Sequence, residues 1–260
     1  MKDNFSTQSA AYARFRPGYP TALLEHLCRI SPALDTAWDC ATGNGQIAAV
    51  LAEHFRQVEA TDISENQLKN AIQQPNIRYQ VGAAETTSFP DRSFDLITVG
   101  QAAHWFDLDR FYAETRRLLK PGGVLALIGY NLLTVAPAVD ALVLHLYRDV
   151  LGSYWDAERR LVEQAYATLS FPFEEMAFPE TVMAYTWKRD DLIGYLNTWS
   201  ALQHFVKEKG VSPITPAFLQ ELEAGWPDGI EKTVRFPIFG RIGVFGFASQ
   251  RTWDFADQAD

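Results

Sequence analysis

Short apolar runs alternate with helical repeats along the first half of the chain. The apolar runs predict strands, and between them apolar residues recur at the spacing of an amphipathic helix. We predict strands at 36–40, 57–62, 76–81, 93–100 and 123–130, and helices at 46–54, 64–72 and 107–119. Strands that alternate with helices in this way indicate an α/β fold with a mainly parallel sheet covered on both faces.

After Tyr130 the pattern becomes mainly helical and dense in aromatic residues. We predict helices at 138–168, 190–208 and 216–224, and strands at 181–187, 232–238 and 241–248, the last two forming a hairpin. The aromatic residues have two interpretations, core packing or a lid over a substrate pocket. They are Tyr154, Trp155, Tyr185, Trp187, Tyr195, Trp199, Phe205 and Trp226.

Composition and charge narrow the class of protein. No apolar run approaches the roughly 20 residues that span a bilayer, and the first residues show no secretory signal. The two cysteines, Cys28 and Cys40, cannot form a metal site alone and suit a reducing compartment, so we expect a cytoplasmic protein without metal. The net charge of −9, without an extended Lys/Arg cluster, argues against nucleic acid or an anionic membrane as a partner.

Polar residues stand at or just past the ends of the predicted parallel strands. Asp39, Asp62, Glu85 and Gln101 occupy these positions, and a glycine turn, Gly43-Asn44-Gly45, follows the first strand. Ligands of open parallel sheets bind outside the carboxyl ends of the strands. The pattern therefore predicts a nucleoside site at this edge.

The glycine turn has two interpretations. Gly43 and Gly45, with Asp62 to hold a ribose, fit a dinucleotide fingerprint and hence an NAD(P)-dependent oxidoreductase. A pyrophosphate, however, needs helix amides that no carboxylate opposes, and Asp39 leads into this helix. Asp39 suits a cationic ligand without phosphate, such as S-adenosylmethionine. The oxidoreductase remains the alternative, although no hydride-transfer constellation is visible.

Over most of residues 5–130 the chain resembles class I S-adenosylmethionine-dependent methyltransferases, of the type 11-like group. The motifs that carry the resemblance follow in the family's order: Asp39-Cys40-Ala41-Thr42-Gly43-Asn44-Gly45, Asp62-Ile63-Ser64 with Leu68, Gly82-Ala83-Ala84-Glu85, Ser93-Phe94-Asp95-Leu96-Ile97 and Lys120-Pro121-Gly122-Gly123. Ala41 stands where the family has its first glycine. The resemblance implies a Rossmann-like, doubly wound, mainly parallel seven-stranded sheet with an antiparallel C-terminal strand, and a helical insertion over its C-terminal edge.

The resemblance also implies S-adenosylmethionine as cofactor and a role for each matching residue. Gly43 and Gly45 give backbone access to the aminoacyl part, Asp39 lies near the ammonium, and Asp62 accepts from both ribose hydroxyls. Ile63 packs on the adenine, Ala84 and Glu85 lie at its edge, and Gln101, Ala102 and His104 lie beneath the methionine. The full expected cofactor set is Tyr12, Arg16, Asp39, Ala41, Gly43, Gly45, Gln46, Asp62, Ile63, Ala84, Glu85, Gln101, Ala102 and His104.

Two stretches are similar to the subgroup that includes trans-aconitate methyltransferases. One is Phe5 with Tyr12, Arg16-Pro17 and Tyr19-Pro20, and the other is Gln101 to Asp107. Arg16 is a candidate for binding a carboxylate, with a surface ion pair as the alternative. His104 is a candidate general base, with a structural hydrogen-bonding role as the alternative. Both are predicted catalytic residues.

The acceptor is expected to be a small molecule, because the Asn-Pro-Pro-Tyr motif of DNA and protein amide methylators is absent after the fourth strand. The methyl group goes to O, N or C, with a carboxylate among the candidates, by in-line displacement. A cofactor-binding protein without catalysis is the third alternative. We expect one methyltransferase domain, 1–260, made of a cap segment and helix (1–34), the cofactor-binding core (35–130), a helical aromatic region (131–230) and closing strands with a tail (231–260). The oligomeric state is not predicted.

Overall fold

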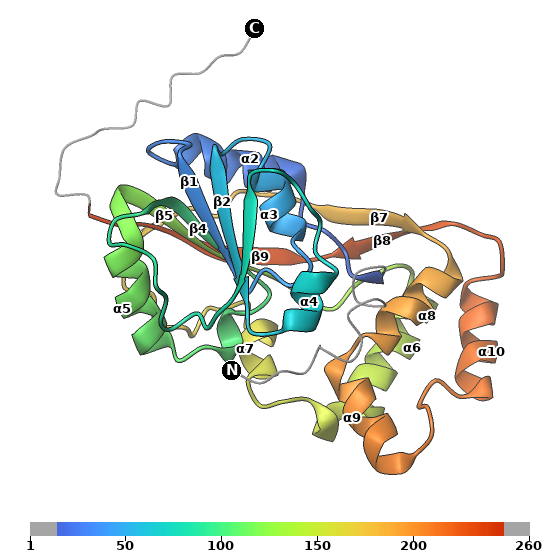
Figure 1. The fold of residues 1–260 in the computed structure, drawn as a ribbon. Coiled ribbons are helices and arrows are strands. Elements are labelled where there is room, and N and C mark those ends of the chain that lie inside the picture. Colours follow the sequence, from blue (N-terminus) through green and yellow to red (C-terminus); the bar gives the residue numbers. More distant parts are fainter. Residues whose placement is uncertain (1–14, 247–260) are drawn as a thin grey trace, which may run out of the picture.

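The computed structural model describes residues 15–246, and a sheet runs through its centre (Figure 1). Within that range the sheet has seven strands: β1 (Thr36–Cys40), β2 (Gln57–Asp62), β3 (Ile77–Val81), β4 (Phe94–Gly100), β5 (Leu119–Tyr130), β6 (Glu174–Met176) and β9 (Ile238–Val244). Their spatial order is β3-β2-β1-β4-β5-β9-β6. The first five are parallel, and β9 is antiparallel to β5 and β6. The predicted Rossmann-like α/β fold is confirmed.

Helices cover both faces of the sheet. They are α2 (Thr21–Ile30) and α3 (Gln46–Leu51) on one face and α5 (Leu108–Leu118) on the other, with the short α4 (Glu65–Lys69) beside β2 and β3. Alternate residues of β5 enter the two cores: Val124 and Ala126 pack on the side of α2 and α3, whereas Leu125 and Leu127 pack on the side of α5. Burial on both faces explains the continuous apolar run of this strand.

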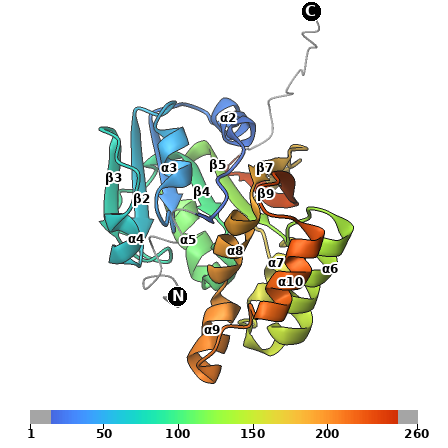
Figure 2. The ribbon, with the colours of Figure 1, turned by 90° about the vertical axis from the view of Figure 1, so that its right-hand side faces the viewer.

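A second group of helices lies beside the sheet (Figure 2). It contains α6 (Pro137–His145), α8 (Arg189–Asn197), α9 (Ser200–Lys209) and α10 (Pro216–Gly225), next to a small sheet of β7 (Met183–Trp187) and β8 (Lys232–Phe236). These elements share a core in which Val143, Leu196, Leu222 and Trp226 are fully buried. The short α7 (Arg159–Glu163) packs instead toward the α5 side of the sheet through Val162. No helix in the described part of the chain is both long and apolar enough to cross a membrane.

The predicted hairpin of 232–238 and 241–248 is wrong. β8 pairs antiparallel with β7, whereas β9 enters the main sheet between β5 and β6. Only Pro237 separates β8 from β9, and a hairpin needs a loop of at least about two residues. The chain therefore passes straight from the small sheet into the large one.

The two longest helical spans predicted in the second half each contain more than one helix. Residues 138–168 form α6, a π-helical turn at Leu146–Val150, a 3₁₀ turn at Gly152–Tyr154 and the separate α7. The span 190–208 divides between α8 and α9 at Thr198 and Trp199. This second interruption matters for the site, because it leaves the carbonyl oxygen of Thr198 available to a side chain from another part of the chain.

Candidate active site

The turn between β1 and α3 has three residues in the left-handed backbone region. Their φ angles are 55° at Ala41, 56° at Gly43 and 80° at Gly45. Glycine adopts this region freely, whereas an alanine there costs roughly 1–2 kcal/mol. The family preference for glycine at position 41 therefore has a conformational reason, and Ala41 satisfies the same geometry at some cost.

The side chain of Asp39 stabilises this turn through hydrogen bonds. Its buried carboxylate accepts hydrogen bonds from Thr42 Oγ1 (2.5 Å), Thr98 Oγ1 (2.9 Å) and the backbone N–H of Ala48 (3.1 Å). Burial raises the pKa of Asp39 to about 6; these three hydrogen bonds act in the opposite direction, and the nearby Asp62 raises it further. The carboxylate thus already accepts the N–H of Ala48, one of the backbone amides at the start of α3 that a pyrophosphate would need.

Asp62 joins the end of β2 to the same turn. Its Oδ2 accepts from the N–H of Gly43 (2.9 Å), and its Oδ1 accepts from the N–H of Ser64 (2.8 Å). A carboxylate has about four acceptor sites, so both oxygens keep capacity for a ribose hydroxyl.

A first cavity lies among the segment 16–19, the turn and the ends of β4 and β5. It is lined by Arg16, Pro17, Tyr19, Asp39, Ala41, Thr42, Gly43, Asn44, Gln46, Ile47, Gly100 and Tyr130. Of the predicted cofactor set it brings together Arg16, Asp39, Ala41, Gly43 and Gln46. The predicted cofactor set omits Tyr19, Thr42 and Asn44, although all three lie inside the stretches that carry the resemblance.

The other predicted cofactor residues are not in this lining. Gly45, Asp62, Ile63, Ala84, Glu85 and Ala102 lie outside it, and Gln101 and His104 face a second cavity. Tyr12 and Phe5 lie outside the residues that the structure describes.

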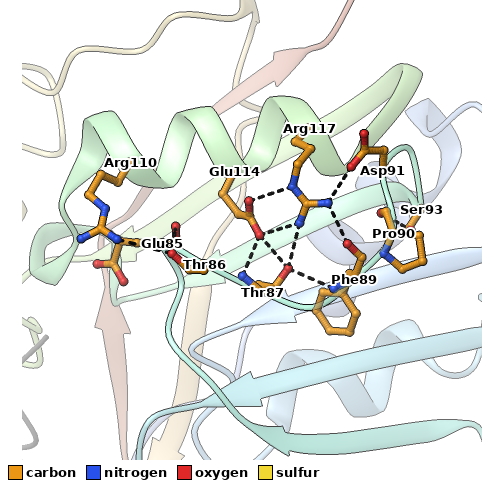
Figure 3. A network of polar contacts seen from close by, with 10 residues as sticks. All are labelled: Glu85, Thr86, Thr87, Phe89, Pro90, Asp91, Ser93, Arg110, Glu114 and Arg117. Carbon is orange, nitrogen blue, oxygen red and sulfur yellow. Dashed lines mark hydrogen bonds and ion pairs between the residues drawn. The ribbon is translucent and has the colours of Figure 1, made fainter.

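A polar network fixes the loop around Glu85 to α5 (Figure 3). Glu85 Oε1 accepts from the N–H of Asp107, the residue that caps α5. Further along, the guanidinium of Arg117 donates to Glu114, to Asp91 and to the carbonyl oxygen of Phe89. The predicted adenine-edge loop is thus held in place by side chains on the covering helix.

A second cavity adjoins the first at the end of β4. Its lining combines aromatic, basic and polar residues: Arg16, Gln101, His104, Trp105, Trp155, Asp156, Arg159, Tyr195, Trp199 and Ser200. Among the aromatic residues noted in the sequence, Trp155, Tyr195 and Trp199 line it, whereas Trp226 is fully buried in the core. Core packing therefore holds for Trp226 and also for Tyr195 and Trp199, which are buried in the same core, whereas a lid over a substrate pocket stays a prediction.

Arg16 lines both cavities. Its Nη1 donates to Tyr130 Oη (2.9 Å), its Nη2 donates to the carbonyl oxygen of Thr198 (3.1 Å), and its Cζ lies 5.3 Å from the ring centroid of Tyr195. The same segment is held again where Tyr185 Oη donates to the carbonyl oxygen of Gly18 (2.7 Å). The segment therefore joins the sheet to the helical group across the site.

His104 lies in a buried position at the second cavity. Its Nδ1 is 3.1 Å from Tyr166 Oη, and burial, followed by the charge of Arg159, lowers its pKa to about 3. The imidazole is therefore uncharged at neutral pH. Such a low pKa makes it a weak proton acceptor and favours the hydrogen-bonding alternative.

Gln101 shapes the boundary between the cavities. It has a left-handed φ of 52°, and its side-chain amide exchanges hydrogen bonds of 2.9 and 3.0 Å with the backbone N–H and carbonyl of Tyr130. The ends of β4 and β5 are thereby fastened together. Within residues 15–246, no group of three or more His, Cys, Asp or Glu side chains could hold a metal ion.

Comparisons with known proteins agree with this geometry. Residues 38–127 match a family model described as "Methyltransferase domain". The chain is 33% identical over 245 residues to a "Putative methyltransferase" of Dictyostelium discoideum, covering 91% of this chain and 93% of that protein. The chain belongs to the methyltransferase family. A solved structure of a "Putative Type II Methyltransferase" from Anaeromyxobacter dehalogenans is 41% identical, with a TM-score of 0.82, covering 89% of this chain and 99% of that one. A "Probable S-adenosylmethionine-dependent methyltransferase" of Saccharomyces cerevisiae is 25% identical over 170 residues, covering 60% of this chain and 58% of that protein.

S-adenosylmethionine is the cofactor of this methyltransferase family, and the lining of the first cavity suits the aminoacyl part of that cofactor. A Cβ atom added at Gly43 would meet nothing within 4 Å, so the backbone there is open to a ligand, whereas at Gly45 the phenol of Tyr79 already occupies that space. The cavity's described lining holds one guanidinium, Arg16, and one carboxylate, Asp39. This pairing suits the oppositely charged groups of the cofactor's aminoacyl part.

Proposed function

We propose that this methyltransferase transfers a methyl group from S-adenosylmethionine to a small-molecule acceptor held in the second cavity. The observation that carries the proposal is the position of two consecutive residues: Gly100 lines the first cavity and Gln101 lines the second. The two cavities thus meet at the end of β4. A group transferred between them crosses only this boundary.

The bound cofactor supplies an electrophilic methyl group on a sulfonium. The residues of this chain then orient the acceptor and exclude water, which are the main needs of an in-line displacement. With the cofactor bound, Asp62 would hold the ribose, the turn at Gly43 would offer its backbone to the aminoacyl part, and Glu85 and Ala84 would contact the adenine. Trp105, Trp155 and Trp199 supply apolar walls for the acceptor.

His104 supports orientation better than proton removal in this scheme. With its pKa lowered to about 3 by burial and by Arg159, it is uncharged in the working range and hydrogen-bonds through Nδ1. An acceptor that is already an anion needs no base. The narrower resemblance to trans-aconitate methyltransferases remains a prediction.

Calorimetry with S-adenosylmethionine, followed by a screen of acceptors with methyl-labelled cofactor, tests the proposal. We expect cofactor binding and label transfer to at least one class of small molecule. Absence of binding at millimolar cofactor would overturn the proposal. Tight binding without transfer to any acceptor would instead support a cofactor-binding protein without catalysis.

A further inference from the structure

Arg159 is held rigidly at the second cavity. Its Nε donates to Tyr147 Oη (3.0 Å), and its Cζ lies 5.0 Å from the ring centroid of Trp155 and 5.6 Å from that of Tyr147. Tyr147 is fixed in turn, because its hydroxyl donates to Glu163 (2.6 Å) and its carbonyl accepts from the indole of Trp155 (3.0 Å). The guanidinium is therefore positioned before any ligand arrives.

The two terminal nitrogens of the Arg159 guanidinium, Nη1 and Nη2, make no hydrogen bond within the described part of the chain. Within residues 15–246, no ion pair joins Arg159 to an acid. Asp156 lines the same cavity. A half-buried, preorganised guanidinium with two outward donors is suited to a carboxylate, which it can bind with two parallel hydrogen bonds.

The charge of the second cavity also favours a carboxylate ligand. Its described lining carries two guanidinium groups, Arg16 and Arg159, and one carboxylate, Asp156. Two of the aromatic rings in this lining already contact these groups, since Arg16 lies over Tyr195 and Arg159 lies over Trp155. A cationic acceptor would therefore meet repulsion from both guanidinium groups.

We propose that Arg159 binds a carboxylate of the methyl acceptor, so that the enzyme selects small acids with an apolar, planar body over amines and neutral amides. This inference rests on the proposed function, because it describes the acceptor of the same transfer. The indole rings of Trp105, Trp155 and Trp199 line the same cavity, and flat apolar surfaces of this kind favour a planar body.

The test compares matched acids, amides and amines in the presence of S-adenosylhomocysteine, the unreactive product of the cofactor. Benzoate, phenylacetate and cinnamate are titrated beside their amides and beside benzylamine, with tryptophan fluorescence and calorimetry as readouts. We expect at least one acid to bind about tenfold or more tightly than its amide, as one charge-assisted hydrogen bond would give. Arg159→Gln should abolish this preference, and Arg159→Lys should keep part of it.

Arg160→Gln is the matched control. Arg160 is the next residue on α7, is exposed and is absent from the lining of the second cavity, so its substitution removes the same charge from outside that cavity. Together with Arg159 it lines an open cleft beside the cavity. The cofactor product should bind all variants equally, which also shows that they fold. Equal binding of acids and amides, preference for the amine, no binding of any acid at millimolar concentration, or an equal effect of Arg160→Gln would overturn the inference. Failure of the wild-type protein to bind the cofactor product would instead overturn the proposed function.

Discussion

Nη1 of Arg16 donates a 2.9 Å hydrogen bond to the phenol oxygen of Tyr130, across 114 positions of the sequence. Tyr130 ends β5, and Arg16 stands just before α2, so the bond fastens the start of the described chain to the carboxyl edge of the sheet. The same guanidinium reaches the break between α8 and α9. One side chain thus connects the strands, the helical group and both cavities.

A double-mutant cycle measures this connection. We expect Arg16→Ala and Tyr130→Phe to show a coupling free energy of about 1–2 kcal/mol in urea unfolding, because a bond to a charged, partly buried donor is lost in either variant. Arg16→Ala combined with Tyr112→Phe, on the opposite face of the sheet, is the control pair. The free-energy changes of the two substitutions in the control pair should add. Coupling of equal size in both pairs would contradict a specific interaction between Arg16 and Tyr130.

Asp62→Ala should weaken S-adenosylmethionine binding by about tenfold or more, since at least one charge-assisted hydrogen bond to the ribose is lost. The affinity of Asp62→Asn should lie between those of the wild type and Asp62→Ala, because its amide oxygen still accepts from one backbone N–H of the turn. Calorimetry measures all three proteins. Glu65→Ala, an exposed acid in the following helix, should bind as the wild type does; unchanged affinity in Asp62→Ala would remove the ribose role.

Asp39 should make the stability of the protein depend on pH. Its folded-state pKa is raised from 3.8 to about 6 by burial, so the protonated form is favoured in the folded protein. Its contribution is present below about pH 4 and is lost as the pH rises through 6, a change of about 3 kcal/mol. Asp39→Asn keeps an acceptor oxygen and cannot ionise. The unfolding free energy of the wild type should therefore fall relative to that of Asp39→Asn as the pH rises from 4 to 7. A difference that does not depend on pH would contradict the raised pKa of Asp39.

Ala41→Gly should be neutral or stabilising by up to about 1 kcal/mol. It relieves a left-handed alanine, worth about 1–2 kcal/mol, while adding about 0.4–1 kcal/mol of entropy to the unfolded chain. Ala48→Gly, in the adjoining α3, is the matched control and should destabilise by about 1 kcal/mol. Chemical unfolding measures both, and equal losses would show that residue 41 is not strained.

His104 should leave no imidazole step in the pH dependence of kcat/KM between about pH 5 and 8. Its pKa of about 3 places its titration below this range. His104→Gln, which keeps a hydrogen-bonding group, should retain more activity than His104→Ala. A step near pH 6.5 that disappears in both variants would instead establish the general-base role.

The sequence predicted the first half of the fold because local patterns determine it. Buried parallel strands require continuous apolar runs, and the turn at Gly43 requires residues that tolerate left-handed backbone, so both leave a signal in the chain. Even there, Asp39 is more deeply engaged in holding the turn than its expected contact with the cofactor suggests, because hydrogen-bond donors 3, 9 and 59 positions away converge on it.

The second half was harder to predict because its structure depends on distant contacts. β8 pairs with β7 across about fifty residues, and no turn motif announces that pairing. Arg159 carries no motif at all, and its environment exists only once Tyr147 and Trp155 surround it. The residues that we propose for binding the acceptor are therefore the part of this protein that sequence patterns describe least.

The second hydrogen bond of Arg16 ends on a main-chain oxygen, the carbonyl of Thr198. This carbonyl oxygen is present whatever side chain position 198 carries, provided that the helix is interrupted there. Side chains of the helical group can therefore be substituted one at a time, and the preferred methyl acceptor can change with them. The hydrogen bond of Arg16 to the main chain survives each exchange, so under the proposed function the preferred methyl acceptor can change while the contact of Arg16 with the first cavity is kept.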